Sequence, residues 1–177
     1  GQLYFNSTTN TFKETITDVP GATWASGTAL NTARKQGMGA GTNDAALIGG
    51  GTSSPESGKT ETWNGSAWTE VNDLNNARSY MAGAGTSTAS LAFGGGPGSS
   101  PNLDTYTETW DGSSWTEVNN LNGAKRELGG SGTNTAAIGF GGESGASPGK
   151  NTNSTETWNG SSWTEVNNLN TGRAQVT

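Results

Sequence analysis

The 177-residue chain contains no cysteine and no histidine. Without cysteine it has no disulfide and no thiolate metal site. Without histidine it has no Ser-His-Asp or Cys-His catalytic arrangement and no imidazole-bound metal. We therefore expect a protein that is not an enzyme and that needs no metal and no cofactor.

Hydrophobic residues are scarce, at 29% of the chain, against about 45–50% in ordinary globular proteins. No apolar run approaches the ~20 residues that span a membrane, so we expect no membrane insertion. The formal net charge is −6, which disfavours nucleic acid and anionic membranes as partners. The 29 glycines would by themselves favour disorder, but the regular pattern described next argues against it.

One stretch of the chain occurs three times. Thr60 to Asn75 reads TETWNGSAWTEVNDLN, and Thr107 to Asn122 and Thr155 to Asn170 are nearly the same. The first Trp recurs after 47 and then 48 residues, and a period in the 40s indicates a repeat architecture. The second Trp has a fourth copy, so all seven tryptophans belong to the repeat: Trp24, Trp63, Trp68, Trp110, Trp115, Trp158 and Trp163. Their strict recurrence predicts packing in a core, although exposed indoles could stack on sugars.

Each repeat predicts four short strands. Asn64-Gly65 and its two counterparts are hairpin turns between Thr/Trp-rich strands. A strand of small residues and an apolar strand ending in glycines complete the unit. The glycines that we expect to be structural are Gly49, Gly50, Gly94, Gly95, Gly141 and Gly142. Four strands in 45 to 50 residues are typical of a propeller blade.

The order of these features resembles the Kelch-type β-propeller repeat, over roughly residues 24–177. It departs from that pattern in having Trp instead of Tyr before the turn and a shorter turn to the next Trp. The resemblance implies an all-β fold, a Kelch-like propeller of four-stranded blades at about 31–72, 73–119 and 120–167, with a partial one at 168–177. Galactose-oxidase-like enzymes share Kelch repeats, but their copper site needs histidine and cysteine, so that likeness ends at the scaffold.

The two ends of the chain leave alternatives open. Residues 1–23 do not fit the repeat, and we expect an N-terminal hairpin that acts as a connector, or else contributes to a composite blade. At the other end, residues 173–177 start an inner strand. We favour a fragment of a longer protein. The alternatives are a ring of four blades that takes strands from both termini, and a ring shared by two copies.

A basic residue stands just before each inner strand. On a propeller such equivalent places form a ring on one face, which could bind the carboxylate or sulfate of a glycan. The structural alternative is a salt bridge or a hydrogen bond to nearby carbonyls. These candidate ligand-binding residues are Arg34, Arg78, Lys125 and Arg173.

Paired glutamates recur in each hairpin, as in Glu61 and Glu70. If they lie opposite each other, a cation sits between them or both lie at a solvated edge. The loops at 51–58, 96–103 and 143–153 vary between copies. They are either flexible connections or the places where binding specificity resides.

The glycine-, threonine- and asparagine-rich repeat, preceded by GQLYFNSTTNTFK at residues 1–13, also resembles repeats in bacteriophage tail-fibre and other virion proteins. That resemblance implies a structural or host-recognition component of a virion appendage, extracellular, with other virion or surface proteins and cell-surface polysaccharide as partners. The first alternative is a bacterial or archaeal surface protein, an adhesin or filament subunit that self-associates. The second is a glycan-processing enzyme whose catalytic part lies outside this chain.

Overall fold

The computed structural model describes residues 3–6, 11–14, 27–52, 56–97, 103–145 and 150–175. Trp24 and the middle of each variable loop lie outside these described residues. The fold is all-β, as expected: the described part of the chain contains fourteen strands and no helix.

Two strands near the N-terminus form a sheet of their own. β1 (Leu3–Asn6) pairs antiparallel with β2 (Thr11–Glu14), and Leu3 lies opposite Glu14 in the ladder.

Three four-stranded antiparallel sheets follow, each with its strands in sequence order. The first sheet consists of β3 (Met38–Gly41), β4 (Ala46–Gly49), β5 (Thr60–Trp63) and β6 (Trp68–Val71). The second consists of β7 (Ala82–Gly85), β8 (Ser90–Phe93), β9 (Thr107–Trp110) and β10 (Trp115–Val118). The third consists of β11 (Gly129–Gly132), β12 (Ala137–Phe140), β13 (Thr155–Trp158) and β14 (Trp163–Val166).

The hairpin turns form for a local reason. In the first sheet the side-chain oxygen of Asn64 accepts hydrogen bonds from the backbone N–H groups of Ser66 and Ala67, at 3.0 and 2.9 Å. Gly65 takes a φ of 90°, which glycine adopts without strain. The turns at Asp111 and Asn159 repeat this bonding.

One expected glycine pair is displaced by a residue. Gly94 and Gly141 follow β8 and β12 with φ of 68° and 64°. Their counterpart in the first sheet is Gly50, with φ of 65°, whereas Gly49 still belongs to β4. The pair in the first repeat is therefore Gly50–Gly51. The sequence predicted Gly49–Gly50 because three glycines stand in a row at 49–51 and do not show where the strand ends.

The two tryptophans of each hairpin have different tasks. The first lies opposite the second across the turn and donates its indole N–H to the neighbouring turn: Trp110 Nε1 lies 3.1 Å from the carbonyl oxygen of Ser87. The second reaches the preceding sheet, where Trp115 Nε1 donates to Thr60 Oγ1 at 2.9 Å. Their tilted rings lie 5.4 Å apart, centroid to centroid.

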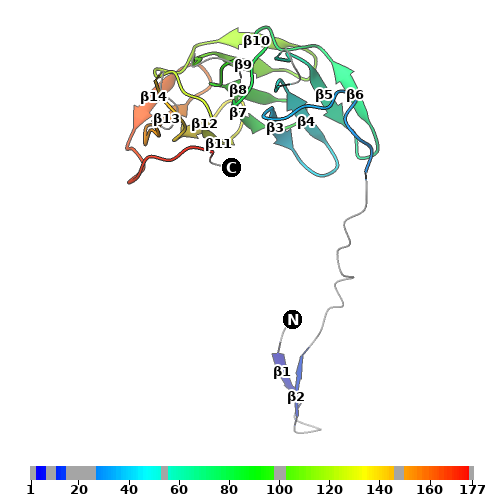
Figure 1. Ribbon diagram of the computed structural model, residues 1–177. Helices are drawn as coiled ribbons and strands as arrows, with labels where there is room; N and C mark the ends of the chain where they lie inside the picture. Colours follow the sequence, from blue (N-terminus) through cyan, green and yellow to red (C-terminus); the bar gives the residue numbers. More distant parts are fainter. Residues whose placement is uncertain are drawn as a thin grey trace.

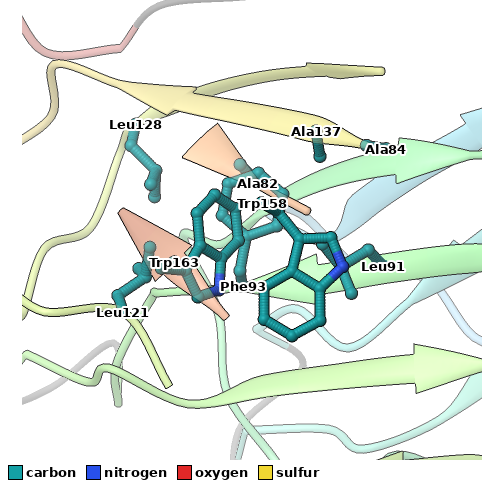
Figure 2. Close-up of a cluster of buried hydrophobic side chains, with 9 residues drawn as sticks. All are labelled: Ala82, Ala84, Leu91, Phe93, Leu121, Leu128, Ala137, Trp158 and Trp163. Atoms are coloured by element: carbon teal, nitrogen blue, oxygen red, sulfur yellow. The ribbon is translucent and has the colours of Figure 1, made fainter. Parts of the chain in front are cut away.

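The apolar core lies between neighbouring sheets. Between the second and third sheets, Phe93 packs against Trp163 with ring centroids 4.7 Å apart, and Trp158 lies beside them (Figure 2). A matching cluster between the first two sheets includes Met38, Leu47 and Trp115. Trp63 and Trp68 are only half-buried. Core packing is therefore the role of Trp110, Trp115, Trp158 and Trp163.

The three sheets stand side by side in an open arc, with the first and third at opposite ends (Figure 1). Their inner strands make the contacts along this arc, β3 with β7 and β7 with β11. The described residues form no closed ring of sheets. The repeated four-stranded unit is as the sequence predicts, and ring closure stays a prediction.

Gly94 and Gly39 give a matched test of the glycine positions. A Cβ at Gly94 would lie 2.7 Å from the carbonyl oxygen of Lys125 at a φ of 68°, whereas a Cβ at Gly39 would meet nothing within 4 Å. We expect Gly94→Ala to lower the free energy of unfolding by about 1–3 kcal/mol, and Gly39→Ala to leave it unchanged or raise it by about 0.5–1 kcal/mol. Urea unfolding followed by tryptophan fluorescence measures both. Equal effects would contradict the assignment.

Candidate functional site

Three of the four basic residues that the sequence singles out lie in the interior. The side chains of Arg34, Arg78 and Lys125 are 0%, 1% and 2% exposed, and each pairs with a buried glutamate of β5, β9 or β13. The expected ring of exposed basic side chains is therefore wrong for these three. Only Arg173 is exposed. Burial and pairing make the three residues structural, so they do not present an anion site to solvent.

The third sheet shows how each buried glutamate is held. Lys125 Nζ lies 2.7 Å from Glu156 Oε1. The backbone N–H and side-chain amide of Asn122 donate to Glu156 Oε2 at 2.8 and 2.9 Å, and the same amide reaches the carbonyl oxygen of Trp163 at 3.1 Å. Asn31 with Arg34 holds Glu61 in the same way, as Asn75 with Arg78 holds Glu108.

These contacts set the pKa of the buried carboxyls. Burial raises the pKa of Glu61, but the N–H groups of Asn31 and Thr32 and the charge of Arg34 together lower it below its usual 4.5. Burial likewise raises the pKa of Glu156, and its bonds with Lys125 and Asn122 bring it below 4.5. Both groups are thus held in the charged form.

The paired glutamates do lie directly opposite each other, as Glu156 and Glu165 do. The solvated-edge interpretation is wrong for the first member of each pair, because Glu156 is 1% exposed and a cation is bound to it. The second member is exposed. In the first sheet this outer member, Glu70, makes a surface salt bridge with Lys59 at 2.8 Å.

A pocket opens where the chain enters the inner strands. We name it the entry pocket; its cavity of about 290 Å³ is lined by Gln36, Gly37, Tyr80, Met81, Glu127, Leu128 and Gln175. The residues come from equivalent positions in successive repeats, two or three positions after the basic residue. The guanidinium carbon of Arg126 lies 5.5 Å from the centre of the Tyr80 ring, and Arg126 pairs with Glu143 at 2.9 Å.

Four pocket residues share an unusual backbone conformation. Gln36, Tyr80, Glu127 and Gln175 have φ of 62°, 58°, 55° and 56°. Residues other than glycine rarely adopt this left-handed conformation, and such strain gathers at functional sites. A chain of hydrogen bonds holds it: Tyr80 N–H donates to Gln36 at 2.8 Å, Glu127 N–H to Tyr80 at 2.8 Å, and Gln175 N–H to Glu127 at 2.9 Å.

Sequence reasoning missed these four residues, although a signal was present. Each stands two positions after the basic residue, and the four copies read Gln, Tyr, Glu and Gln. A position that differs between copies of a nearly constant repeat carries a side chain that the common fold does not determine. Its backbone conformation could not be recognised, because none of the four is glycine.

The variable loops are described only at their ends. Residues 53–55, 98–102 and 146–149, in the middle of the loops, lie outside the described residues. Within the described ranges, no three acidic side chains gather as metal ligands would. The same ranges include no helix of the length and apolarity that crossing a membrane requires.

Comparisons with known proteins bear on the fold. No protein-family model matches the chain, and no curated protein matches it. The solved structure of YjhT is similar to it, with a TM-score of 0.67 and 15% sequence identity, over 82% of this chain and 54% of YjhT. The chain thus spans about half the length of that protein. A likeness at this identity shows a shared fold and nothing of function.

The buried and exposed glutamates predict losses of stability of very different size. Glu156→Gln leaves the Lys125 ammonium buried without its carboxylate, so we expect a loss of about 3–5 kcal/mol in the free energy of unfolding. Glu70→Gln removes an exposed partner of Lys59, and we expect a loss below about 1 kcal/mol. Denaturant unfolding at pH 7 measures both. Similar values for the two variants would refute the structural role of the buried pair.

The lowered pKa values also predict acid sensitivity. Because Glu61 and Glu156 have pKa values in the folded state below 4.5, their contribution to stability is complete above that pH. It is lost as the pH falls through the lowered pKa values. We expect the urea midpoint to be flat from pH 7 to about 5 and to fall below it. A midpoint that rises on acidification would contradict these pKa directions.

Proposed function

We propose that the protein is a non-enzymatic binding module built of Kelch-like propeller blades, and that its entry pocket binds a glycan. The proposed setting is a bacteriophage tail fibre or similar virion appendage, where the ligand is a host surface polysaccharide. One observation carries the proposal. Four equivalent, strained backbone positions direct Gln36, Tyr80, Glu127 and Gln175 to one pocket.

The side chains of the pocket fit the chemistry of a sugar. Tyr80 offers an aromatic ring that packs on the C–H groups of a pyranose while its hydroxyl remains a hydrogen-bonding group. The amides of Gln36 and Gln175 both donate and accept hydrogen bonds, and the Glu127 carboxylate accepts them from hydroxyls. A cavity of about 290 Å³ lies at the lower end of ligand pockets, which hold about 300–1,000 Å³. It suits one sugar ring better than an extended oligosaccharide.

Charge favours a neutral or amino sugar over an acidic one. Glu127 lines the pocket, and the chain carries a net charge of −6. Arg126, whose guanidinium lies over the Tyr80 ring, already pairs with Glu143. A sulfated or carboxylated sugar would therefore meet repulsion. This ligand class differs from the one expected for an exposed ring of basic residues.

The arrangement of the sheets supports the propeller part of the proposal. The inner strands contact each other in sequence order, β3 to β7 to β11. The first sheet packs on the second, and the second on the third, with tryptophans in both apolar clusters. The likeness to YjhT covers 82% of this chain at a TM-score of 0.67.

Substitutions in the entry pocket should weaken glycan binding. We expect the full chain to bind a neutral or amino-sugar-containing bacterial polysaccharide on a glycan array. Tyr80→Ala and Glu127→Gln should each lower the affinity at least ~10-fold, because a buried stacking or hydrogen-bond contact is worth about 1–1.5 kcal/mol. Isothermal titration calorimetry with the array hit measures the change.

Tyr106→Ala is the matched control, since Tyr106 is 39% exposed and does not line the pocket. Its affinity should equal that of the unsubstituted chain. If the Tyr80→Ala/Glu127→Gln double variant binds as tightly as the control, the pocket is not the site. A preference for sulfated or carboxylated glycans would overturn the argument from charge.

A further inference from the structure

The face of the third sheet that points away from the second sheet lacks a contact that the other two sheets make on the corresponding face. Thr60 Oγ1 and Thr107 Oγ1 accept hydrogen bonds from Trp115 and Trp163 of the next sheet, at 2.9 and 3.0 Å. Thr155 holds the same position in β13 and is only 4% exposed. Within the described residues its Oγ1 has no partner. A buried acceptor is thus left without the indole N–H that its two counterparts receive.

The apolar side chains on this face are likewise uncovered. Val118 packs into the cluster between the second and third sheets, while its counterpart Val166 is 41% exposed. Phe93 is fully buried against Trp163, whereas its counterpart Phe140 is only half-buried. The face therefore has the shape and composition of a joint between sheets with one side absent.

The segment after β14 carries an asparagine and a basic residue whose side chains are unused within the residues that the structure describes. Residues 169–173 read LNTGR and repeat the pattern in which an Asn and a basic residue hold a buried glutamate. Asn170 and Arg173 are exposed, and in the described part of the chain neither side chain has a partner. The backbone of Arg173 is nevertheless placed as in the other copies: its carbonyl accepts from Gly142 N–H at 2.7 Å, as that of Lys125 does from Gly95 at 2.9 Å.

We propose that this face binds the N-terminal segment, residues 3–24, of a second copy of the same chain. We name the face, with Thr155, Val166, Asn170 and Arg173, the acceptor face. Every glutamate of the TETW motifs is already held within its own repeat. The acceptor face therefore requires a carboxylate and an indole from elsewhere.

The N-terminal segment carries a glutamate and a tryptophan in the order of the repeat, with a longer connection between them: Trp24 follows Glu14 by ten residues, whereas Trp68 follows Glu61 by seven. Glu14 precedes Glu61 by 47 residues, the same interval that separates Glu61 from Glu108. Leu3 pairs with Glu14 in the β1–β2 ladder, as Ile48 pairs with Glu61. Trp24 corresponds in the repeat to Trp115 and Trp163, whose indole N–H groups donate to a threonine of the preceding sheet.

The shape of the arc favours a second copy over the chain's own segment. The first and third sheets lie at opposite ends of the arc (Figure 1). The contacts between inner strands run from β3 to β7 and from β7 to β11, so within the described ranges the third sheet has no neighbouring sheet of the same chain on its far side. Each copy carries a segment at one end and an acceptor face at the other. The contact is head-to-tail, and it makes a ring or a filament.

Charge reversal tests the proposal in the full chain. We expect the unsubstituted protein to self-associate with concentration in sedimentation velocity. Glu14→Arg and Arg173→Glu should each weaken the association at least ~10-fold, because like charges then meet in the joint. A mixture of the two variants should recover association, since Arg173 of one then faces Glu14 of the other.

The control is Glu165→Gln, an exposed change in the same sheet, which should leave association intact. Thr155→Val should keep the sheets folded by tryptophan fluorescence and weaken association. Recovery on mixing requires two chains, so its absence would refute the second copy. A protein that is monomeric at every concentration would overturn the proposal, and so would variants that associate like the unsubstituted chain. Binding of glycan by such a monomer would leave the entry pocket unaffected.

Discussion

A glutamate kept charged in the interior is the interaction on which the rest of this structure depends. In each sheet it joins the segment that enters the innermost strand to the third strand, through one cation and one asparagine. Removing charges from water is expensive, and such pairs add little net stability unless every remaining hydrogen bond is made. Here Asn122 supplies two of them to Glu156 and a further one to a strand carbonyl. The contact therefore specifies register in a chain that has few aliphatic residues to do so.

The joints between sheets follow from that register. Once the third strand is positioned, Thr60 and Thr107 present their hydroxyls to the indoles of the following sheets. Beside these contacts, Phe93 of β8 packs against Trp163 of β14 in the next sheet. Because every joint uses the same few contacts, the stability of the array is close to a sum of unit and nearest-neighbour terms. An incomplete joint is then visible as specific unsatisfied atoms, and Thr155 is one of them.

The sequence predicted the all-β class and the four-stranded unit, because Asn-Gly turns and Trp pairs act over short distances. It did not predict where Arg78 and Lys125 point. Residue type alone does not separate a solvated cation from one held by a glutamate some thirty residues away, as Arg78 is by Glu108. The prediction of the glycine pair after β4 was wrong by one residue, because in a run of three glycines the sequence does not show which two follow the strand. The entry pocket was missed because a left-handed backbone at Tyr80 is set by hydrogen bonds from neighbouring repeats.

The left-handed residues have a consequence for how this protein can change. One chain of backbone hydrogen bonds links the four residues. The left-handed conformation is therefore held by backbone atoms and not by the side chains. Gln36 and Gln175 are exposed and do not belong to the apolar clusters. The side chains at these two positions can therefore be exchanged with little effect on the apolar packing. Side chains of the entry pocket can thus change, and with them the ligand that is recognised, while the packing between the sheets stays the same.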